Sequence, residues 1–322
     1  MSPPPGTRRL AVWQLFAVAV LVWGTTWHVI TWQLGLLAVE WNVAVRFLVA
    51  GALVLAVARA RGATIGATGA QHALLALQGV FLYGLAYVAV YEAERHVPSG
   101  LVAVGYSASP LLSGLGAHWL FGRRVDARFV AGGAVGLAGV ALLFWPEIAR
   151  ADVAATAATG ALWTVAAVLL STVGALAASR NGARGLALWT ALGWGMVYGG
   201  AAAAAWAVAS GRPFALPLEP RWWLALAWLA LAGSIAAFAC FLTLQERIGP
   251  GPAGAVGVMT PLLALVVSMA LEGFRPDVRT ALGALLAVAG NALMLRRRAP
   301  RVGGRLSSAP GTSAPAASPA AE

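Results

Sequence analysis

Long hydrophobic runs separated by short polar segments divide the chain into ten stretches that can each cross a bilayer. A membrane-spanning helix needs about 20 predominantly apolar residues. The expected spans are 11–33, 42–58, 72–93, 98–121, 127–146, 158–178, 187–209, 222–246, 252–271 and 278–295. The pattern predicts an all-α polytopic membrane protein with ten transmembrane helices.

One stretch of the sequence occurs twice. Ser107–Arg128 aligns without a gap with Val258–Arg279, 151 residues later, and Pro110 falls on Pro261. Self-similarity at a fixed spacing is typical of an internal structural repeat. Each half holds five spans, and because five is odd the second half enters the membrane from the opposite side. The sequence therefore predicts two inverted five-helix repeats.

The repeat also sets the expected domain boundaries. They are a cytoplasmic N-terminus at 1–10, a first repeat at 11–146, a linker at 147–157, a second repeat at 158–295 and a cytoplasmic tail at 296–322. The first apolar run is too long for the core of a signal peptide, so we interpret it as an uncleaved helix. The tail is rich in Ala, Pro, Ser and Gly, a composition typical of disorder.

Composition excludes several classes of protein. Sixty per cent of the residues are hydrophobic and ten per cent are charged, which excludes a soluble globular protein. The net charge of +11 comes from arginines spread between the spans, so nucleic acid is not an expected partner. Cys240 is the single cysteine and has no internal disulfide partner. The four histidines show no metal-ligand spacing, so neither a metal nor a cofactor is expected.

The spacing of the candidate catalytic residues argues against an enzyme. Ser107 and His118 are the best candidates for a nucleophile and its base, but their separation of eleven residues spans ~16 Å of helix. A nucleophile and base must lie within about 3 Å. The chain also lacks a Walker-type phosphate loop, so direct use of ATP is not expected.

The matched prolines are the strongest pointer to a binding site. Proline removes a backbone donor, which frees the carbonyls of Tyr106 and Gly257 in the two repeats. Interrupted helices at corresponding places of two repeats indicate the substrate site of a transporter. Pro110 and Pro261 are therefore predicted hinges beside a cavity, and ordinary structural kinks are the alternative.

Aromatic and polar residues within the spans supply the other site candidates. Tyr83 and Tyr87 lie one helical turn apart and either line a cavity or pack between helices, whereas Tyr91 and Glu94 are expected at the membrane interface. Arg46 lies inside a span and either snorkels or pairs with Glu40, or it binds a substrate carboxylate. The candidates for cavity lining are Trp23, Arg46, Tyr83, Tyr87, Tyr106, Trp163, Phe238 and Met259.

These features together resemble the drug/metabolite transporter superfamily, in its ten-helix EamA-type branch. The resemblance rests on Trp23–Thr26, Arg46-Phe47, Tyr106–Leu112, Val258–Leu263 and Glu272-Gly273. It implies a secondary carrier with a central cavity between the halves and no cofactor. The first repeat departs from the pattern, because Phe121-Gly122 stands where the family often has a glutamate.

The expected function is that of a secondary transporter of the inner membrane that exports amino acids or related small metabolites. A broad multidrug exporter is one alternative, and a non-transporting membrane protein such as a lipid-handling partner is another. The expected partners are a small-molecule substrate and the lipid bilayer, with the protein a monomer or homodimer. His28 and Glu92 are candidates for a proton relay, but the sequence offers neither of them an evident ionisable partner.

The arginines predict the orientation. With the N-terminus inside, 15 arginines lie in cytoplasmic segments and 6 in outer loops, with Arg46 inside a span. Cytoplasmic loops carry the excess of positive charge in membrane proteins. Reporter fusions after Arg298 should therefore give a cytoplasmic signal, and fusions near Pro217 an external one. Opposite signals at both sites would reverse the orientation.

Overall fold

The computed structural model describes residues 10–122, 125–149, 154–183, 185–248 and 253–295. The predicted N-terminal segment, except for Leu10, and the predicted tail lie outside the described residues. Within them, nine helical stretches are long and apolar enough to cross a membrane, and Ala255–Leu271 is a shorter apolar helix.

The helices follow the predicted order closely. Their bounds are α1 Val12–Thr31, α2 Val39–Ala60, α3 Gly69–Gly79, η1 Val80–Leu85, α4 Ala86–Glu94, α5 Ser99–Gly105, η2 Tyr106–Ala108, α6 Ser109–Phe121, α7 Ala127–Ala149, α8 Ala154–Ala183, α9 Leu188–Ala209, α10 Pro220–Ala227, η3 Trp228–Ala236, α11 Ala237–Ile248, α13 Ala255–Leu271 and α14 Val278–Leu295. Three membrane spans each combine several of these elements: α3 to α4, α5 to α6 and α10 to α11.

The predicted linker, 147–157, is partly helical. Helix α7 continues through Pro146 to Ala149, and α8 begins at Ala154, so most of 147–157 is helical. The remaining positions, 150–153, lie outside the described residues. Alanine is the strongest helix former, and an alanine-rich start extends α8 toward the preceding loop.

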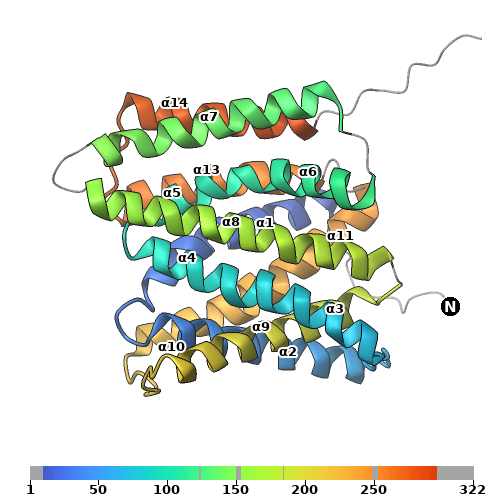
Figure 1. The fold of residues 1–322 in the computed structure, drawn as a ribbon. Coiled ribbons are helices and arrows are strands. Elements are labelled where there is room, and N and C mark those ends of the chain that lie inside the picture. The colour runs from blue at the N-terminus through green and yellow to red at the C-terminus, as the bar shows by residue number, and fades with distance from the viewer. Residues whose placement is uncertain (1–9, 123–124, 150–153, 184, 249–252, 296–322) are drawn as a thin grey trace, which may run out of the picture.

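The helices lie in layers, with two close pairs at opposite edges (Figure 1). Helix α7 packs along α14 at one edge, and α2 packs along α9 at the other. Between them α1 contacts α13 and α11, and α8 makes the corresponding contacts with α6 and α4. A shift of 151 residues converts the contacts of α1 into those of α8, because it places α1 on α8, α6 on α13 and α4 on α11. This is the arrangement expected of two inverted five-helix halves.

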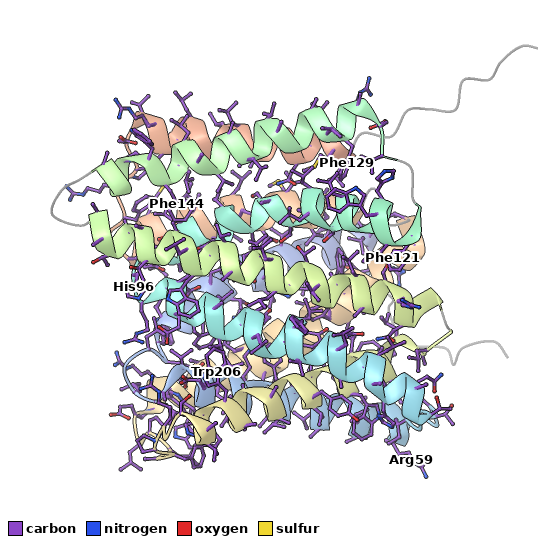
Figure 2. All side chains as sticks on the ribbon, viewed as in Figure 1. Arg59, His96, Phe121, Phe129, Phe144 and Trp206 are labelled. Atoms are coloured by element: carbon purple, nitrogen blue, oxygen red, sulfur yellow. The ribbon has the colours of Figure 1, made fainter. Side chains whose placement is uncertain are left out.

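We call the two ends of the helix bundle the terminal face and the far face. The terminal face holds the start of α1 and the end of α14, and the far face holds the end of α4 and the start of α5. Figure 2 shows Arg59 and Phe121 at the terminal face and His96 at the far face. Large apolar side chains are exposed on the spans, among them Leu162 on α8, which is 70% exposed. Such a surface fits a lipid environment.

Two π-helical stretches lie at related positions in the two halves. They are η1, Val80–Leu85, and η3, Trp228–Ala236. A shift of 151 residues places all of η1 within η3. In η3 the Ser234 hydroxyl donates to the Leu229 carbonyl at 2.8 Å. Short π-helical insertions are rare and occur frequently at functional sites.

Glycine allows the close approach of the edge helices. A Cβ atom at Gly139 would lie 2.4 Å from the Ala287 nitrogen and 2.6 Å from the Gly283 oxygen. One at Gly290 would lie 2.5 Å from the Gly132 oxygen. Small residues that let backbones touch are a main source of helix association in lipid.

Gly139→Ala should therefore destabilise the protein, because the added methyl would force α7 away from α14. Overpacking typically costs about 1–3 kcal/mol. Thermal unfolding of the detergent-solubilised protein would show a lower midpoint. Gly136→Ala is the matched control, because its Cβ would lie 3.8 Å from the Ala287 oxygen, an ordinary contact. Equal midpoints for the two variants would contradict the close packing.

Candidate functional site

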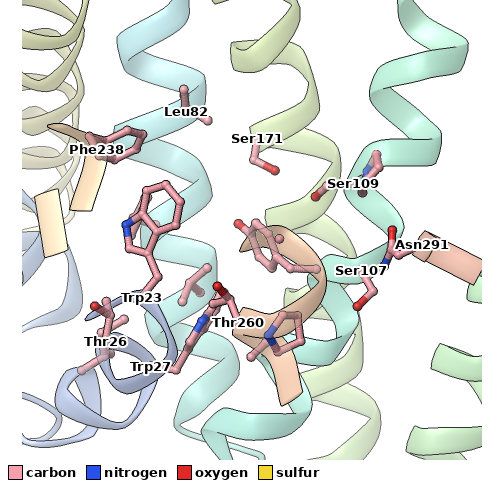
Figure 3. A pocket seen from close by; sticks show the side chains of 18 residues that line it. Trp23, Thr26, Trp27, Leu82, Ser107, Ser109, Ser171, Phe238, Thr260 and Asn291 are labelled. Atoms are coloured by element: carbon pink, nitrogen blue, oxygen red, sulfur yellow. The ribbon is translucent and has the colours of Figure 1, made fainter. Parts of the chain in front are cut away.

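A cavity of about 320 Å³ lies between the two halves in the middle of the bundle (Figure 3). Small-molecule sites are typically cavities of roughly 300–1,000 Å³. The cavity is lined by Trp23, Thr26, Trp27, Ile30, Leu82, Tyr87, Val90, Ala103, Tyr106, Ser107, Ser109, Pro110, Ser171, Phe238, Gly257, Thr260, Pro261 and Asn291. Both prolines and both halves therefore contribute to one cavity.

The cavity lining extends toward both faces. Gly257 lines it two residues after α13 begins at the terminal face, and Ile30 lines it one residue before α1 ends at the far face. The cavity therefore occupies the middle of the bundle.

Aromatic rings form much of the lining. Trp23 packs edge-on against Phe238 with ring centroids 5.0 Å apart, and its indole N–H donates to the Gly233 carbonyl at 3.0 Å. Trp27 packs against Tyr106 at 5.3 Å. The rings come from α1, the first proline segment and the second repeat. This lining offers flat apolar surfaces to an aromatic or apolar molecule.

Neutral polar groups supply the rest. The Ser107 hydroxyl oxygen is buried, and neither it nor that of Ser109 has a hydrogen-bond partner among the described residues. Ser171 and Thr260 instead donate to carbonyls of their own helices. Buried polar atoms in native proteins normally have partners. The two free hydroxyls therefore mark a place where a bound molecule or water makes hydrogen bonds.

The two proline segments differ from each other. In the first, Tyr106–Ala108 form a turn of 3-10 helix and α6 begins just before Pro110. The Ser109 N–H donates to the Tyr106 carbonyl, so the carbonyl expected to be free is satisfied. In the second repeat α13 continues through Pro261, and Gly257 lines the cavity, where water or ligand can reach its carbonyl. Proline interrupts the helix only in the first copy.

Arg46 lies beside the cavity but does not line it. Its side chain is 1% exposed, which excludes snorkelling, and Glu40 pairs instead with Arg212 at 3.5 Å. The guanidinium lies over the rings of Phe47 and Tyr87, at 5.0 and 4.8 Å, and its Nε donates to Ser234 at 3.4 Å. Arg46 thus supports Tyr87 from behind the cavity wall.

The other predicted site residues separate into two groups. Trp23, Tyr87, Tyr106, Phe238, Pro110 and Pro261 meet at the cavity. Tyr83 instead packs against Phe47 at 5.3 Å, Trp163 packs against the hydrophobic core, and Met259 is 43% exposed. The π-helical stretch explains why Tyr83 and Tyr87 separate, because its extra residue rotates the later part of the helix. Sequence reasoning did not single out Ser109, Ser171, Thr260 or Asn291.

Glu272 closes the far face by joining the two halves. Its carboxylate accepts hydrogen bonds from His28 Nδ1 at 2.9 Å, the Ser99 N–H at 3.0 Å, the Ser268 hydroxyl at 2.8 Å and the Ser99 hydroxyl. We call these four residues the far-face latch. His28, which had no evident partner in the sequence, therefore has one.

The tautomer of His28 follows from its second contact. The Trp32 indole N–H donates to His28 Nε2 at 3.2 Å, so Nε2 is unprotonated and Nδ1 carries the hydrogen that binds Glu272. Glu272 thus receives four donors and is ionised. Burial raises the pKa of the Glu272 carboxyl, but hydrogen bonds from Ser99, His28 and Ser268 outweigh burial and hold the pKa below its usual value.

A second set of buried contacts adjoins the latch. Tyr91 is fully buried and donates to Gln33 at 2.8 Å, and Trp222 donates to Asn42 at 2.7 Å. Glu94 is 7% exposed. Tyr91 and Glu94 are therefore interior residues, contrary to the interfacial position expected from the sequence, because α4 is covered by α8, α2 and α5.

Comparison with known proteins agrees with this architecture. The model of the EamA-like transporter family matches residues 11–145 and 158–296. The chain is 29% identical over 270 residues to an uncharacterized inner membrane transporter, YedA, of Escherichia coli strain K12, covering 80% of this chain and 82% of that one. The same protein of Escherichia coli O157:H7 matches equally. One crystal structure matches 88% of this chain and 96% of its own, with a TM-score of 0.63 and 22% identity, which shows the fold.

Glu272→Ala should loosen the far face, because three residues lose their shared acceptor. Hydrogen bonds to charged groups contribute about 1.5–3 kcal/mol, so amide hydrogen exchange across 99–105 should become roughly tenfold faster or more. Mass spectrometry of the exchanged peptides measures this. Glu219→Ala is the control, because the Glu219 side chain caps no helix. Unchanged exchange in the Glu272 variant would show that the latch does not hold the face closed.

Proposed function

Because the chain belongs to the EamA-like transporter family, we propose that it is a secondary transporter of the inner membrane that exports small metabolites by alternating access. The family establishes the class of protein, and the substrate and mechanism are the proposal. The inner-membrane location is supported by the apolar helices and by the description of the Escherichia coli relative.

One observation carries the mechanism. The cavity is built from both inverted halves, and the latch, which also crosses between the halves, holds the far face together. In inverted-repeat transporters a central site is exposed to one side at a time as the halves rock. Because the latch holds the far face closed, we expect the cavity to load from the terminal face, which the arginines predict to be cytoplasmic, and this direction is export.

The lining favours one class of substrate. Among the described residues that line the cavity, none is an aspartate, glutamate, lysine, arginine or histidine. Burying an unpaired charge is costly, so a molecule with net charge would enter unfavourably. Neutral metabolites with an aromatic or apolar part fit the rings and hydroxyls best, and a zwitterion fits where Ser107, Ser109 and Asn291 hydrogen-bond its charged groups. Amino acids of that kind are the first candidates.

The aromatic rings also favour a second candidate, a broad-specificity drug exporter. Trp23, Trp27 and Phe238 present apolar surfaces that would accept many planar molecules. The volume of about 320 Å³ lies at the small end of ligand sites, which favours metabolites over large drugs. A lipid-handling protein is less well supported, because no described basic side chain lines the cavity.

Counterflow in proteoliposomes tests the proposal. Vesicles loaded with unlabelled phenylalanine should accumulate labelled phenylalanine, and a nucleoside and the cationic dye ethidium complete the panel. Accumulation of ethidium alone would favour the drug exporter. No counterflow with any of the three would leave the metabolite-export proposal without support.

Tyr106→Ala should weaken the apparent affinity for the transported compound, because the ring that packs on Trp27 lines the cavity. A loss of about 1.4 kcal/mol of binding free energy would raise the half-saturating substrate concentration about tenfold. The measurement is the concentration dependence of counterflow, normalised to the amount of folded protein. Trp145→Ala removes an aromatic ring that is 57% exposed on α7 and serves as the control. Equal effects of the two substitutions would place the substrate elsewhere.

A further inference from the structure

At the far face, half-buried Glu272 and buried Glu94 are in opposite states of hydrogen bonding. Glu272 accepts four hydrogen bonds in the latch. Glu94 is 7% exposed, and neither of its carboxyl oxygens has a partner among the described residues. An unpaired buried carboxylate is strongly unfavourable, whereas the protonated acid is much less so. The hydrogen bonds thus assign the negative charge to Glu272 and a proton to Glu94.

The charged neighbours of Glu94 explain why only one of the two carboxyls is ionised here. Arg46 on α2 and Glu272 after α13 both act electrostatically on Glu94, in opposite directions. Tyr91 lies on the same helix, His28 on α1 is held by the latch, and His96 packs against α8 at Gly160. The described parts of α5 and α8 bring no titratable group to this level.

Arg46 is also incompletely satisfied. Its Nη1 atom is buried without a hydrogen-bond partner, and no ion pair joins it to Glu94 among the described contacts. Arg46 and Glu94 both belong to the first half, on α2 and α4, which contact each other. Glu272 belongs to the second half. When the halves separate at the far face, Glu272 moves away, and water and Arg46 become available to an ionised Glu94.

We propose that Glu94 is a proton-binding site whose occupancy is coupled to the far face: the closed face holds the proton, and the open face releases it to the solution on that side. The proton leaves the carboxylic acid for water, and the carboxylate that remains gains hydration and the nearby guanidinium. Closing the face reverses both steps. The inference rests on the proposed function in requiring that the far face opens.

Linkage fixes the direction of the pH effect. Because the closed state binds one more proton, lower pH favours closure and higher pH favours opening. One linked proton changes the ratio of closed to open molecules by up to about tenfold per pH unit, between the pH values at which the group titrates in the two states. With the far face outside, external protons would return the emptied transporter to the state that loads from the cytoplasm.

The test is amide hydrogen exchange across 94–105 in the full-length protein between about pH 5.5 and 8.5. The Glu94→Gln variant has no carboxyl group to ionise at this position, so its far face should remain closed. At each pH its amides should exchange more slowly than those of the wild type, and the ratio of the two rates should grow by up to about tenfold per pH unit. Comparison at equal pH removes the intrinsic pH dependence of exchange. Glu92→Gln is the matched control, because that carboxylate pairs with Arg95 near the surface and should leave exchange as in wild type.

Equal exchange of Glu94→Gln and wild type at every pH would overturn the proposal. If that variant does not fold, the wild-type protein still decides: exchange at 94–105, divided by exchange at the α7–α14 edge, should rise with pH, and a constant ratio would overturn it. Neither readout needs a substrate. Failure of counterflow with the pH effect intact would contradict transport while leaving the proton site standing.

Discussion

The hydrocarbon core of a bilayer offers no hydrogen-bond partners, and this constraint organises the molecule. The backbone satisfies itself in helices, and Leu162 and similar side chains cover the outside. Polar side chains within the spans form part of the cavity wall and the far-face latch. The few that remain unsatisfied, Ser107 and Glu94 among them, therefore indicate where water, substrate or a proton completes the structure.

Two kinds of contact hold the helices, and they differ in how readily they can change. At the edges, Gly139 with Gly283 and Gly132 with Gly290 bring backbones together, which leaves little freedom for rearrangement. At the far face, side chains from both halves share the single carboxylate of Glu272. Rigid edges with a breakable central contact fit a machine whose halves rock about a cavity. The proposed proton at Glu94 would bias that contact.

Local patterns predicted the spans, the inverted repeat and the prolines at the cavity, because hydrophobic periodicity and proline chemistry act within a few residues. Contacts between distant segments were not predictable. Arg46 bonds Ser234, 188 residues away, and His28 bonds Glu272, 244 residues away. The π-helical stretch η1 was also missed, because close packing against Gly195 and Gly199 of α9 accompanies it. Its extra residue separates Tyr83 from the cavity.

The central claim is that one cavity is reached from each face in turn. Thr260 lines the cavity, and Thr260→Cys in a Cys240→Ala background introduces a single thiol there. The measurement is its reaction with a membrane-impermeant thiol reagent applied to one face at a time in oriented vesicles. We expect the thiol to be labelled from both faces. Any condition that increases labelling from one face should decrease labelling from the other. Labelling from the terminal face alone under every condition would contradict it.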